Sequence, residues 1–381
     1  MYLLDETHLD IRRAAREFAL GEFNDIGSEY DKKEEFPFEV WKKACNLGFI
    51  GMFIQEKYGG AGVGMLETVL TIEEFSRVDP AFTSILYTTL GSEIIQTYGD
   101  PFQKAVYLPS LAKGEAIMGA PCNGRYFNLA TKSILTASNV GEEYLVNGEE
   151  LFVMNGSIAN YLIITCLTSP RSNLVQEKFS TIIIPTTSPK IKSLEIKGKF
   201  GLRTLNFARV FFENARIPGE NIINGNGEGY RHLEHLTNTF NIYFAAQGLG
   251  IAQGALDMAV NYAKIRKQFG LPIGHFQSTR LKIAEMATLV ESARILLYQT
   301  ALDFDKGTEN RSMVLMTRWF TGEVCEKNTE GSIQLHGGYG FTKDYKIERL
   351  YRDGHALGIL NGSKEKIKLG IADSLLGRKE A

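Results

Sequence analysis

The apolar positions in the first third of the chain follow a helical period. From Asp5 to about Lys113, hydrophobic residues recur at steps of three and four, as on one face of an amphipathic helix. Examples are Leu9, Ile11, Ala14 and Phe18, and later Trp41, Ala44 and Leu47. The glycine-rich stretch 59–64 interrupts the pattern and predicts a loop, after which residues 66–75 resume it. No strand pattern competes, so residues 1–115 are expected to form an all-helical N-terminal domain.

The pattern changes near Ala116, where short runs rich in β-branched and aromatic residues begin. These runs are 133–138, 143–147, 151–154, 161–168, 181–185 and 209–213. Asn147-Gly148 separates two of them and predicts a two-residue hairpin turn. Residues 116–225 are therefore expected to form a middle antiparallel β domain.

Helical periodicity returns in longer stretches from Gly229 onward. One apolar stripe is Ile242, Ala246, Leu249, Ala252, Leu256 and Val260, and a second is Ile283, Met286, Val290, Ala293 and Leu297. The polar segment 303–312 predicts a connection to a further helix over about 314–335. Residues 226–381 are expected to form a C-terminal helical-bundle domain. Helices, then strands, then helices is the order of an α+β protein.

Composition narrows the class of protein. The chain has 381 residues, 44% of them hydrophobic and 23% charged, with a formal net charge of −2. These are the values of a soluble globular protein, and no long run of Lys or Arg predicts a nucleic-acid or membrane-surface partner. The four cysteines are widely spaced and form no C-x-x-C pair, so no metal site or disulfide framework is expected. With no signal-peptide block or membrane span, a cytoplasmic location is expected.

Three segments, in order along the chain, resemble the flavin-dependent acyl-CoA dehydrogenases. The first contains 47–51 (LGFIG), 58–60 (YGG) and 73–79 (EEFSRVD). The second contains 198–203 (GKFGLR), 212–218 (FENARIP) and 220–221 (EN). The third contains 266–270 (RKQFG), 276–277 (FQ), 334–340 (QLHGGYG), 349–353 (RLYRD) and 359–363 (ILNGS). The resemblance covers nearly the whole chain and implies a helical N-terminal domain, a β domain and a C-terminal four-helix bundle.

The resemblance also implies FAD as cofactor, with a neighbouring subunit contributing to its site. Arg266 would meet the flavin pyrophosphate, because a guanidinium offers fixed, charge-assisted donors to phosphate oxygens. Phe269 and Gln277 would line the same cofactor. Gln334, with Gly337 and Gly338, would cradle the adenosine half of a second subunit's FAD, and Ser363 replaces the usual threonine. A homotetramer is the assembly implied.

Two positions depart from the family where its catalytic base normally stands. Asn361 replaces the glutamate that usually removes the α-proton of the thioester, and an amide cannot take a proton at physiological pH. An alternative glutamate position, on the long helix that begins the C-terminal domain, is occupied by Phe240. Asn361 therefore stands at the position of the catalytic base but cannot act as a base. A second interpretation is that it hydrogen-bonds a polar substituent of the substrate or the thioester carbonyl. His355 is an alternative base, although a structural role suits it better.

The β domain departs as well. Residues 120–127 replace the family's T-E-P-G-A-G-S-D segment, and the usual W-I-T-N-G appears as 152–156 (FVMNG). Phe152 and Met154 thus stand at flavin-contacting positions, and Met154 lacks the hydroxyl that commonly meets flavin N5. Cys122 is interpreted as an inert thiol and not a nucleophile. His336, inside the 334–340 string, is expected to pack beside the cofactor.

Three functions compete at this point. The leading hypothesis is an FAD-dependent oxidoreductase acting on an acyl thioester, carried by CoA or by an acyl carrier protein, with hydride exchange at flavin N5. Its substrate is expected to be specialised, because the pantetheine-side segment 120–127 is altered. The second is a flavin oxidase or monooxygenase of the same fold, which needs no base at Asn361. The third is a catalytically silent partner subunit of a hetero-oligomer.

Overall fold

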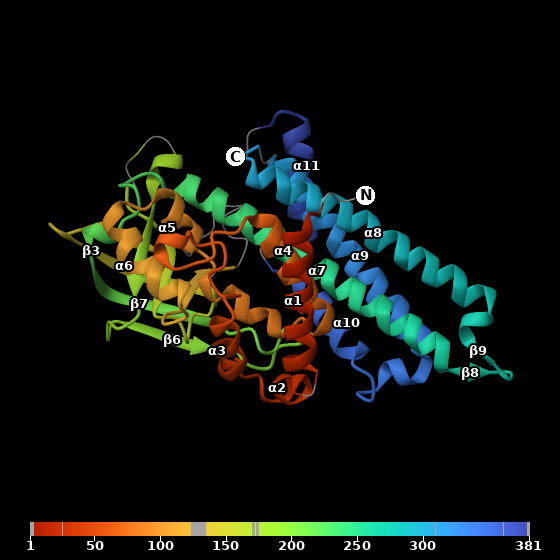
Figure 1. The fold of residues 1–381 in the computed structure, drawn as a ribbon. Coiled ribbons are helices and arrows are strands. Elements are labelled where there is room, and N and C mark those ends of the chain that lie inside the picture. Colours follow the sequence, from red (N-terminus) through yellow and green to blue (C-terminus); the bar gives the residue numbers. More distant parts are fainter. Residues whose placement is uncertain are drawn as a thin grey trace.

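The computed structural model describes residues 4–24, 26–122, 135–169, 172, 175–308, 310–360 and 362–378. Its first region is helical, as Figure 1 shows in red and orange. Its helices are α1 (Glu6–Phe23), α2 (Gly27–Lys33), α3 (Phe38–Asn46), α4 (Met65–Val78), α5 (Ser92–Tyr98) and α6 (Pro101–Ala112). Two 3₁₀ segments, η1 (Glu56–Tyr58) and η2 (Phe82–Thr89), connect them. Asp5 and Asp100 cap α1 and α6 by accepting backbone N–H groups of the first turn.

The middle region forms a sheet whose strand order is β1-β4-β2-β3-β7-β6, with β5 paired to β4. The strands are β1 (Met118–Pro121), β2 (Thr136–Asn139), β3 (Glu143–Met154), β4 (Tyr161–Leu167), β5 (Phe179–Pro185), β6 (Ile191–Glu195) and β7 (Phe207–Pro218). Two short 3₁₀ segments flank these strands, η4 (Val175–Lys178) and η5 (Gly219–Asn221). Most pairs are antiparallel, as expected, but β1–β4 and β2–β4 are parallel. The short strands β1 and β6 were not among the expected runs.

The prediction of a hairpin turn at Asn147-Gly148 is wrong. Residues 143–154 form one continuous strand, β3, that pairs with β7 along its length. The register shifts between Val146 and Gly148, so the glycine marks a bulge and not a turn, with a φ of +121°. The Asn147 side chain turns outward to Asn214, accepting its N–H at 2.8 Å. An Asn-Gly pair is compatible with a β-bulge as well as with a hairpin turn. Here the pairing of β3 with the distant strand β7 selects the bulge.

The last region is a bundle of long helices. It contains α7 (Gly229–Ile265), α8 (Gln277–Asp305), α9 (Arg311–His336), α10 (Ile347–Leu357) and α11 (Lys364–Leu375). A small hairpin of β8 (Lys267–Gln268) and β9 (Leu271–Pro272), then η6 (Ile273–His275), links α7 to α8, and η7 (Gly337–Phe341) follows α9. In Figure 1, α7, α8 and α9 run side by side, and the β8–β9 hairpin lies at the end away from the sheet. The α+β order expected from the sequence is confirmed.

Buried ion pairs join the three regions at the family-like segments. Glu73 on α4 binds Arg294 of α8 at 3.1 Å and accepts a hydrogen bond from Tyr298. Asp79, at the end of α4, binds Arg349 of α10 at 2.6 Å. One helical turn further along α10, Asp353 accepts the Leu202 N–H at 2.6 Å. The string 349–353 therefore attaches α10 both to the N-terminal region and to the loop that precedes β7.

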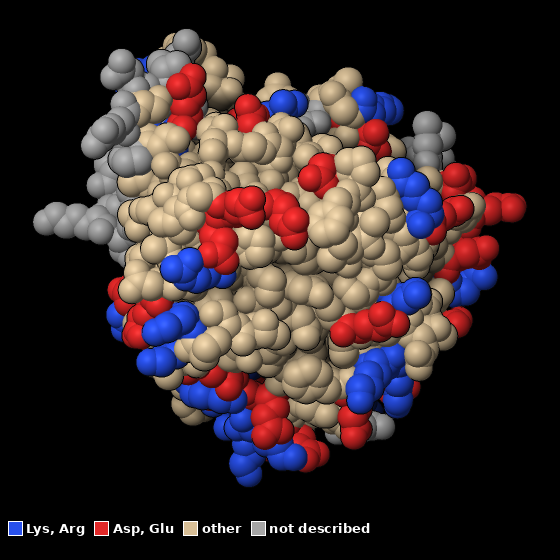
Figure 2. All heavy atoms as spheres, turned by 90° about the vertical axis from the view of Figure 1, so that its left-hand side faces the viewer, with Lys and Arg blue, Asp and Glu red and all other residues tan. Residues whose placement is uncertain are grey.

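One face of the molecule carries charges of both signs. Figure 2 shows the face at the left of Figure 1, where Lys and Arg are interspersed with Asp and Glu and leave a broad area without charge. No basic patch gathers on this face. Among the helices described, none has the length and apolar character that crossing a membrane demands.

We predict that Arg349→Met destabilises the fold strongly. The substitution leaves the carboxylate of Asp79, which has no exposed surface, with Lys346 at 3.4 Å as its only cation among the described residues, beside a hydrogen bond of 3.3 Å from the Ala81 N–H. Removing one partner of a buried pair costs about 3–5 kcal/mol. Urea unfolding followed by circular dichroism measures the loss. Arg209→Met is the matched control, because Arg209 pairs with Glu149 at the surface, where an ion pair contributes at most about 1 kcal/mol. Equal losses of unfolding free energy in the two variants would show that the buried Arg349–Asp79 pair matters no more than a surface pair.

Candidate functional site

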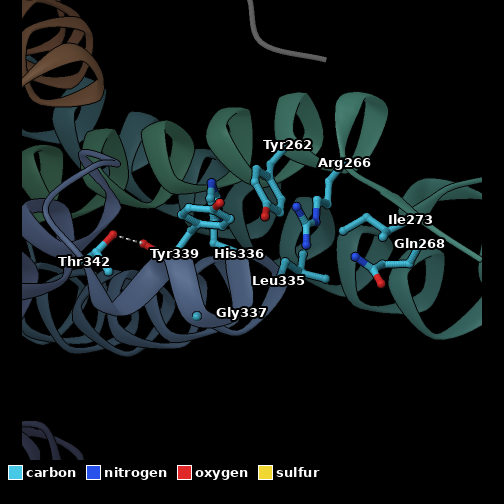
Figure 3. A pocket seen from close by; sticks show the side chains of 10 residues that line it. Tyr262, Arg266, Gln268, Ile273, Leu335, His336, Gly337, Tyr339 and Thr342 are labelled. Atoms are coloured by element: carbon cyan, nitrogen blue, oxygen red, sulfur yellow. Dashed lines mark hydrogen bonds between the residues drawn. The ribbon is translucent and has the colours of Figure 1, made fainter.

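A pocket of about 470 Å³ opens where the ends of α7 and α9 meet. Figure 3 shows Tyr262 and Arg266 reaching into it from α7, with His336, Gly337 and Tyr339 on the opposite wall. Three residues expected to bind the cofactor, Arg266, Gly337 and Gly338, therefore come together. They approach one another because α7 ends at Ile265 and α9 ends at His336 at the same end of the bundle.

The groups in this pocket suit an anionic ligand with a planar part. The Arg266 guanidinium lies 5.7 Å from the centroid of the Tyr339 ring and has no carboxylate partner in the described part of the chain. Gly337 has a φ of +58°, and a Cβ on Gly338 would meet no atom within 4 Å. A free guanidinium, open glycine backbone and aromatic walls match a pyrophosphate joined to an adenosine. These residues therefore fit FAD.

His336 packs in the wall of the pocket. Its Nδ1 lies 2.7 Å from the Ser332 carbonyl oxygen, and its ring stacks on Tyr262 with centroids 4.3 Å apart. Burial lowers the pKa of His336, so the ring is neutral at pH 7 and donates from Nδ1 to that carbonyl. A packing role, as expected from the sequence, accounts for both contacts.

Other residues expected at the cofactor project from the same end without lining the pocket. Phe269 stands at the tip of the β8–β9 hairpin with 95% of its side chain exposed and a φ of +50°. Gln277, the first residue of α8, and Gln334, near the end of α9, are both exposed. The Phe269 ring meets Phe276 edge-on, with centroids 6.3 Å apart, but this contact leaves nearly all of the side chain exposed. An exposed phenylalanine in a left-handed conformation often marks a binding surface.

The remaining expected residues lie elsewhere. Phe152 and Met154 are on β3. This strand belongs to the sheet, and the β8–β9 hairpin lies away from the sheet (Figure 1). Met154 is buried, whereas Phe152 is half exposed. Ser363 caps α11 by accepting the Lys366 N–H. Asn361 lies outside the described residues. One subunit therefore does not bring the two sets of expected flavin contacts together.

A buried hydrogen-bond chain links all three regions beside Met154. Asn155 donates from Nδ2 to the Tyr87 carbonyl at 2.9 Å and to the Met118 carbonyl at 3.1 Å. The Tyr87 hydroxyl donates to Gln247 Oε1 on α7 at 2.9 Å, and Gln247 Nε2 donates to the Pro80 carbonyl. Burial raises the pKa of Tyr87 far above its ordinary value, so its hydroxyl stays a donor. The Asn155 amide nitrogen and both polar ends of the Gln247 side chain are thus bonded, whereas Asn155 Oδ1 has no partner among the described residues. Buried hydrogen bonds of this kind hold a site rigid.

Arg318 is a buried cation next to this chain. Its NH2 donates to the Leu357 carbonyl at 2.7 Å and to the Leu360 carbonyl at 3.4 Å. Its guanidinium lies 5.7 Å from the Phe244 ring centroid, and no carboxylate pairs with it among the residues described. Burial lowers the pKa of Arg318 to about 10, so it stays charged at neutral pH. The carbonyls that end α10 offset this charge, and Arg318 thereby holds the residues leading into Asn361.

Apolar side chains close this region. Phe240 and Phe244 are buried on successive turns of α7, with ring centroids 5.9 Å apart. Phe240, which the sequence resemblance places at the alternative glutamate position, is thus packed among hydrocarbon. Cys122, at the end of β1, is buried, and its N–H donates to the Phe152 carbonyl at 3.0 Å. His355 lies against Tyr351 and its Nδ1 meets the Tyr351 carbonyl, which matches the structural role expected.

Sequence reasoning missed Tyr87 and Arg318. Arg318 carries a usable signal, since it stands on the same helical face as Val314, Thr321 and Cys325, which are all buried. A charged residue within a buried stripe indicates a function or a specific partner. Tyr87 carries no comparable signal, because a tyrosine in an apolar run is ordinary core material.

Comparison with known proteins agrees with this geometry. The acyl-CoA dehydrogenase N-terminal, middle and C-terminal domain families match residues 5–115, 127–215 and 227–376. An acyl-CoA dehydrogenase of Bacillus subtilis is 34% identical, covering 96% of this chain and 97% of its own. An acryloyl-CoA reductase (NADH) of Anaerotignum propionicum is 33% identical, covering 97% and 94%. The butyryl-CoA dehydrogenase structure from Megasphaera elsdenii superposes with a TM-score of 0.92 at 26% identity, covering 99% and 100%.

The chain belongs to the acyl-CoA dehydrogenase family. It is accordingly an FAD-dependent oxidoreductase that acts on a CH–CH group. When bound, FAD supplies the hydride-exchanging centre, and the protein supplies binding, orientation and electrostatics.

We predict that Arg266→Met lowers FAD occupancy, because a charge-assisted contact to phosphate is lost. The expected rise in the FAD dissociation constant is about 10- to 100-fold. Flavin absorbance per subunit after gel filtration measures occupancy, and quenching of flavin fluorescence measures the constant. Lys264→Met is the control, since Lys264 is an exposed cation in the last turn of the same helix. Unchanged FAD content in Arg266→Met would place the pyrophosphate elsewhere.

We predict that Arg318→Met loosens residues 358–363 without displacing FAD. The variant leaves the Leu357 and Leu360 carbonyls without their buried donor. Hydrogen–deuterium exchange of peptides covering 358–363 should become faster, while FAD content stays at the wild-type level. Arg318→Lys keeps a charged donor and should retain most of the protection. Equal exchange in the Lys and Met variants would show that the guanidinium does not order this segment.

Proposed function

We propose that this protein exchanges hydride between a carbon of an acyl thioester and N5 of FAD, on a specialised acyl group. The observation that supports the proposal is the buried centre between Met154 and Leu360. It joins a buried hydrogen-bond chain, Asn155–Tyr87–Gln247, to an aromatic wall and a buried guanidinium. Such a site excludes water and fixes an apolar chain, which hydride exchange at carbon requires.

Each part of the centre has a proposed task. Phe240 and Phe244 exclude water from the reacting carbons and contact the acyl chain. Arg318 holds the turn that presents position 361. The Asn361 amide donates a hydrogen bond to the thioester carbonyl, which lowers the energy of negative charge developing there. It does not move the α-proton, because it has no basic group at neutral pH.

The cofactor site is proposed to be completed by a second copy of the chain. Support comes from the separation of the two sets of expected flavin contacts, on β3 and at the end of α7 and α9. The cofactor of a neighbouring subunit would cover the exposed Phe269 and would pair with Arg266, which has no carboxylate partner among the described residues. We propose in addition that the subunits assemble into a homotetramer. The thioester substrate is carried by CoA or by an acyl carrier protein.

The decisive variant is Asn361→Glu, which restores a carboxylate at the usual base position. We expect it to raise the rate of anaerobic flavin bleaching by simple saturated acyl-CoA thioesters by about 10²- to 10⁴-fold, the contribution of a positioned base. Stopped-flow absorbance under argon follows the reaction. Asn361→Gln is the matched control, because glutamine has the length of glutamate without its basicity.

The outcomes separate the competing functions. Bleaching that rises in Asn361→Glu and not in Asn361→Gln supports thioester oxidoreduction in a site that lacks only its base. Oxygen-dependent product formation without bleaching by any thioester would instead indicate an oxidase or monooxygenase. Purified protein that binds no flavin would indicate the silent partner subunit.

A further inference from the structure

Glu93 is a buried carboxylate with half of its hydrogen-bonding capacity unused. It stands in the first turn of α5, where Oε2 accepts the Gly91 N–H at 2.7 Å. Its Oε1 is buried, and no other residue in the described part of the chain donates a hydrogen bond to it. The buried acids Glu73, Glu74 and Asp79 differ from it, since each is paired with arginine. A buried carboxylate oxygen without a donor is costly and therefore indicates a ligand or an ordered water.

The position of this carboxylate is fixed by the sheet. Gly91 has a φ of +105°, and a Cβ placed on it would collide with the Ile163 side chain of β4. The start of α5 is therefore held directly against the β region, and the Gly91 N–H in turn orients Glu93. The adjacent Ser92 hydroxyl is also buried and makes no hydrogen bond to any residue that the structure describes. Two unpaired polar groups thus lie next to each other along the chain where α5 meets the sheet.

Glu93 belongs to the same buried region as the candidate centre. Helix α5, which carries Glu93, packs against α7, which carries Tyr243. The Glu93 charge adds to the effect of burial in raising the pKa of Tyr243. The Tyr243 ring stacks on Tyr87 with centroids 6.3 Å apart, and Tyr87 contacts Phe244 at 5.9 Å. Phe244 lies under Arg318, which holds Leu360. An aromatic row therefore connects Glu93 with the turn that precedes Asn361.

The chemistry at the two ends of this row differs. Near Leu360 the unpaired group is a cation, whereas near Tyr243 it is a carboxylate whose pKa burial raises to about 7. A purely hydrocarbon acyl chain lying along the row would leave Glu93 Oε1 and Ser92 Oγ unsatisfied. A chain that carries a donor at its far end would satisfy Oε1 and add selectivity, because sites built to bind a polar group discriminate strongly against analogues that lack it.

We propose that Glu93 is a specificity-determining residue that accepts a hydrogen bond from a hydroxyl or amino group at the distal end of the substrate's acyl chain. Ser92 serves as a second polar contact for the same group. This inference rests on the proposed function, since it places the acyl chain along the row from Leu360 to Tyr243.

Matched pairs of thioesters test the proposal on the FAD-loaded protein. The probes are butyryl-CoA with 4-hydroxybutyryl-CoA and 4-aminobutyryl-CoA, and hexanoyl-CoA with its 6-hydroxy and 6-amino counterparts. Isothermal titration calorimetry measures affinity, and anaerobic stopped-flow absorbance measures flavin reduction. The variants are Glu93→Leu and Glu93→Gln, with Glu39→Gln as the control, because Glu39 is an exposed acid on α3.

Wild type and Glu39→Gln should bind a substituted thioester about 10- to 100-fold tighter than its unsubstituted counterpart, the range of hydrogen bonds to a charged group. Glu93→Leu should abolish this preference while changing affinity for the unsubstituted thioester little. Glu93→Gln, which keeps an acceptor but no charge, should keep the preference for hydroxyl and lose that for amine. If Glu93→Leu does not fold, Glu93→Gln and Ser92→Ala carry the test.

Two failures are distinguishable. No preference in wild type, or a preference that survives Glu93→Leu, overturns the inference and assigns Oε1 to a buried water. In that case the unsubstituted thioesters still bind and reduce the flavin, so the proposed function stands. If neither substituted nor unsubstituted thioesters bind or reduce wild-type flavin, the proposed function fails and the inference fails with it.

Discussion

The hydrogen-bond chain Asn155–Tyr87–Gln247 is the constraint on which the candidate centre depends. Each residue comes from a different region: the end of β3, the 3₁₀ segment after α4, and the long helix α7. All three side chains are buried, so breaking any link would leave an unsatisfied polar group away from water. The strand that carries Met154 is thereby held at a set distance from the helix that carries Phe244. Three separately packed regions thus meet at one rigid boundary.

Charges in this molecule divide into those that assemble the fold and those that have no partner within it. Glu73 and Asp79 are paired across regions, where they fix how α4 meets α8 and α10. Arg266, Arg318 and Glu93 lack an oppositely charged partner in the described structure. Burying or restraining an unpaired charge costs stability. Such a cost is tolerated mainly at sites that bind something else, and these three groups lie at the pocket and along the buried centre.

The sequence predicts the order of the regions well because helical periodicity is a local property. The stripes on α7 and α8 and the expected helix near 314–335 match observed helices, whose ends extend beyond the expected ones. Where pairing is long-range, prediction fails: Gly148 sits in a bulge opposite β7, a partner more than sixty residues away. In the site, Arg266, Gly337 and Gly338 could be predicted from resemblance. Tyr87 and Glu93 could not, since their roles arise only when α5, η2 and α7 pack together.

The geometry of one subunit also constrains the assembly. Phe152 and Met154 lie on β3, while Arg266 and Phe269 lie beyond the far end of the bundle. On the function proposed above, a single dinucleotide cofactor that contacts both sets would reach from one subunit to another. If the two subunits are equivalent, each gives its hairpin end to the other's cofactor, and a twofold axis relates the two sites. On that arrangement Phe269, whose exposure has no explanation within the subunit, becomes a buried contact, and cofactor binding and subunit association stabilise each other.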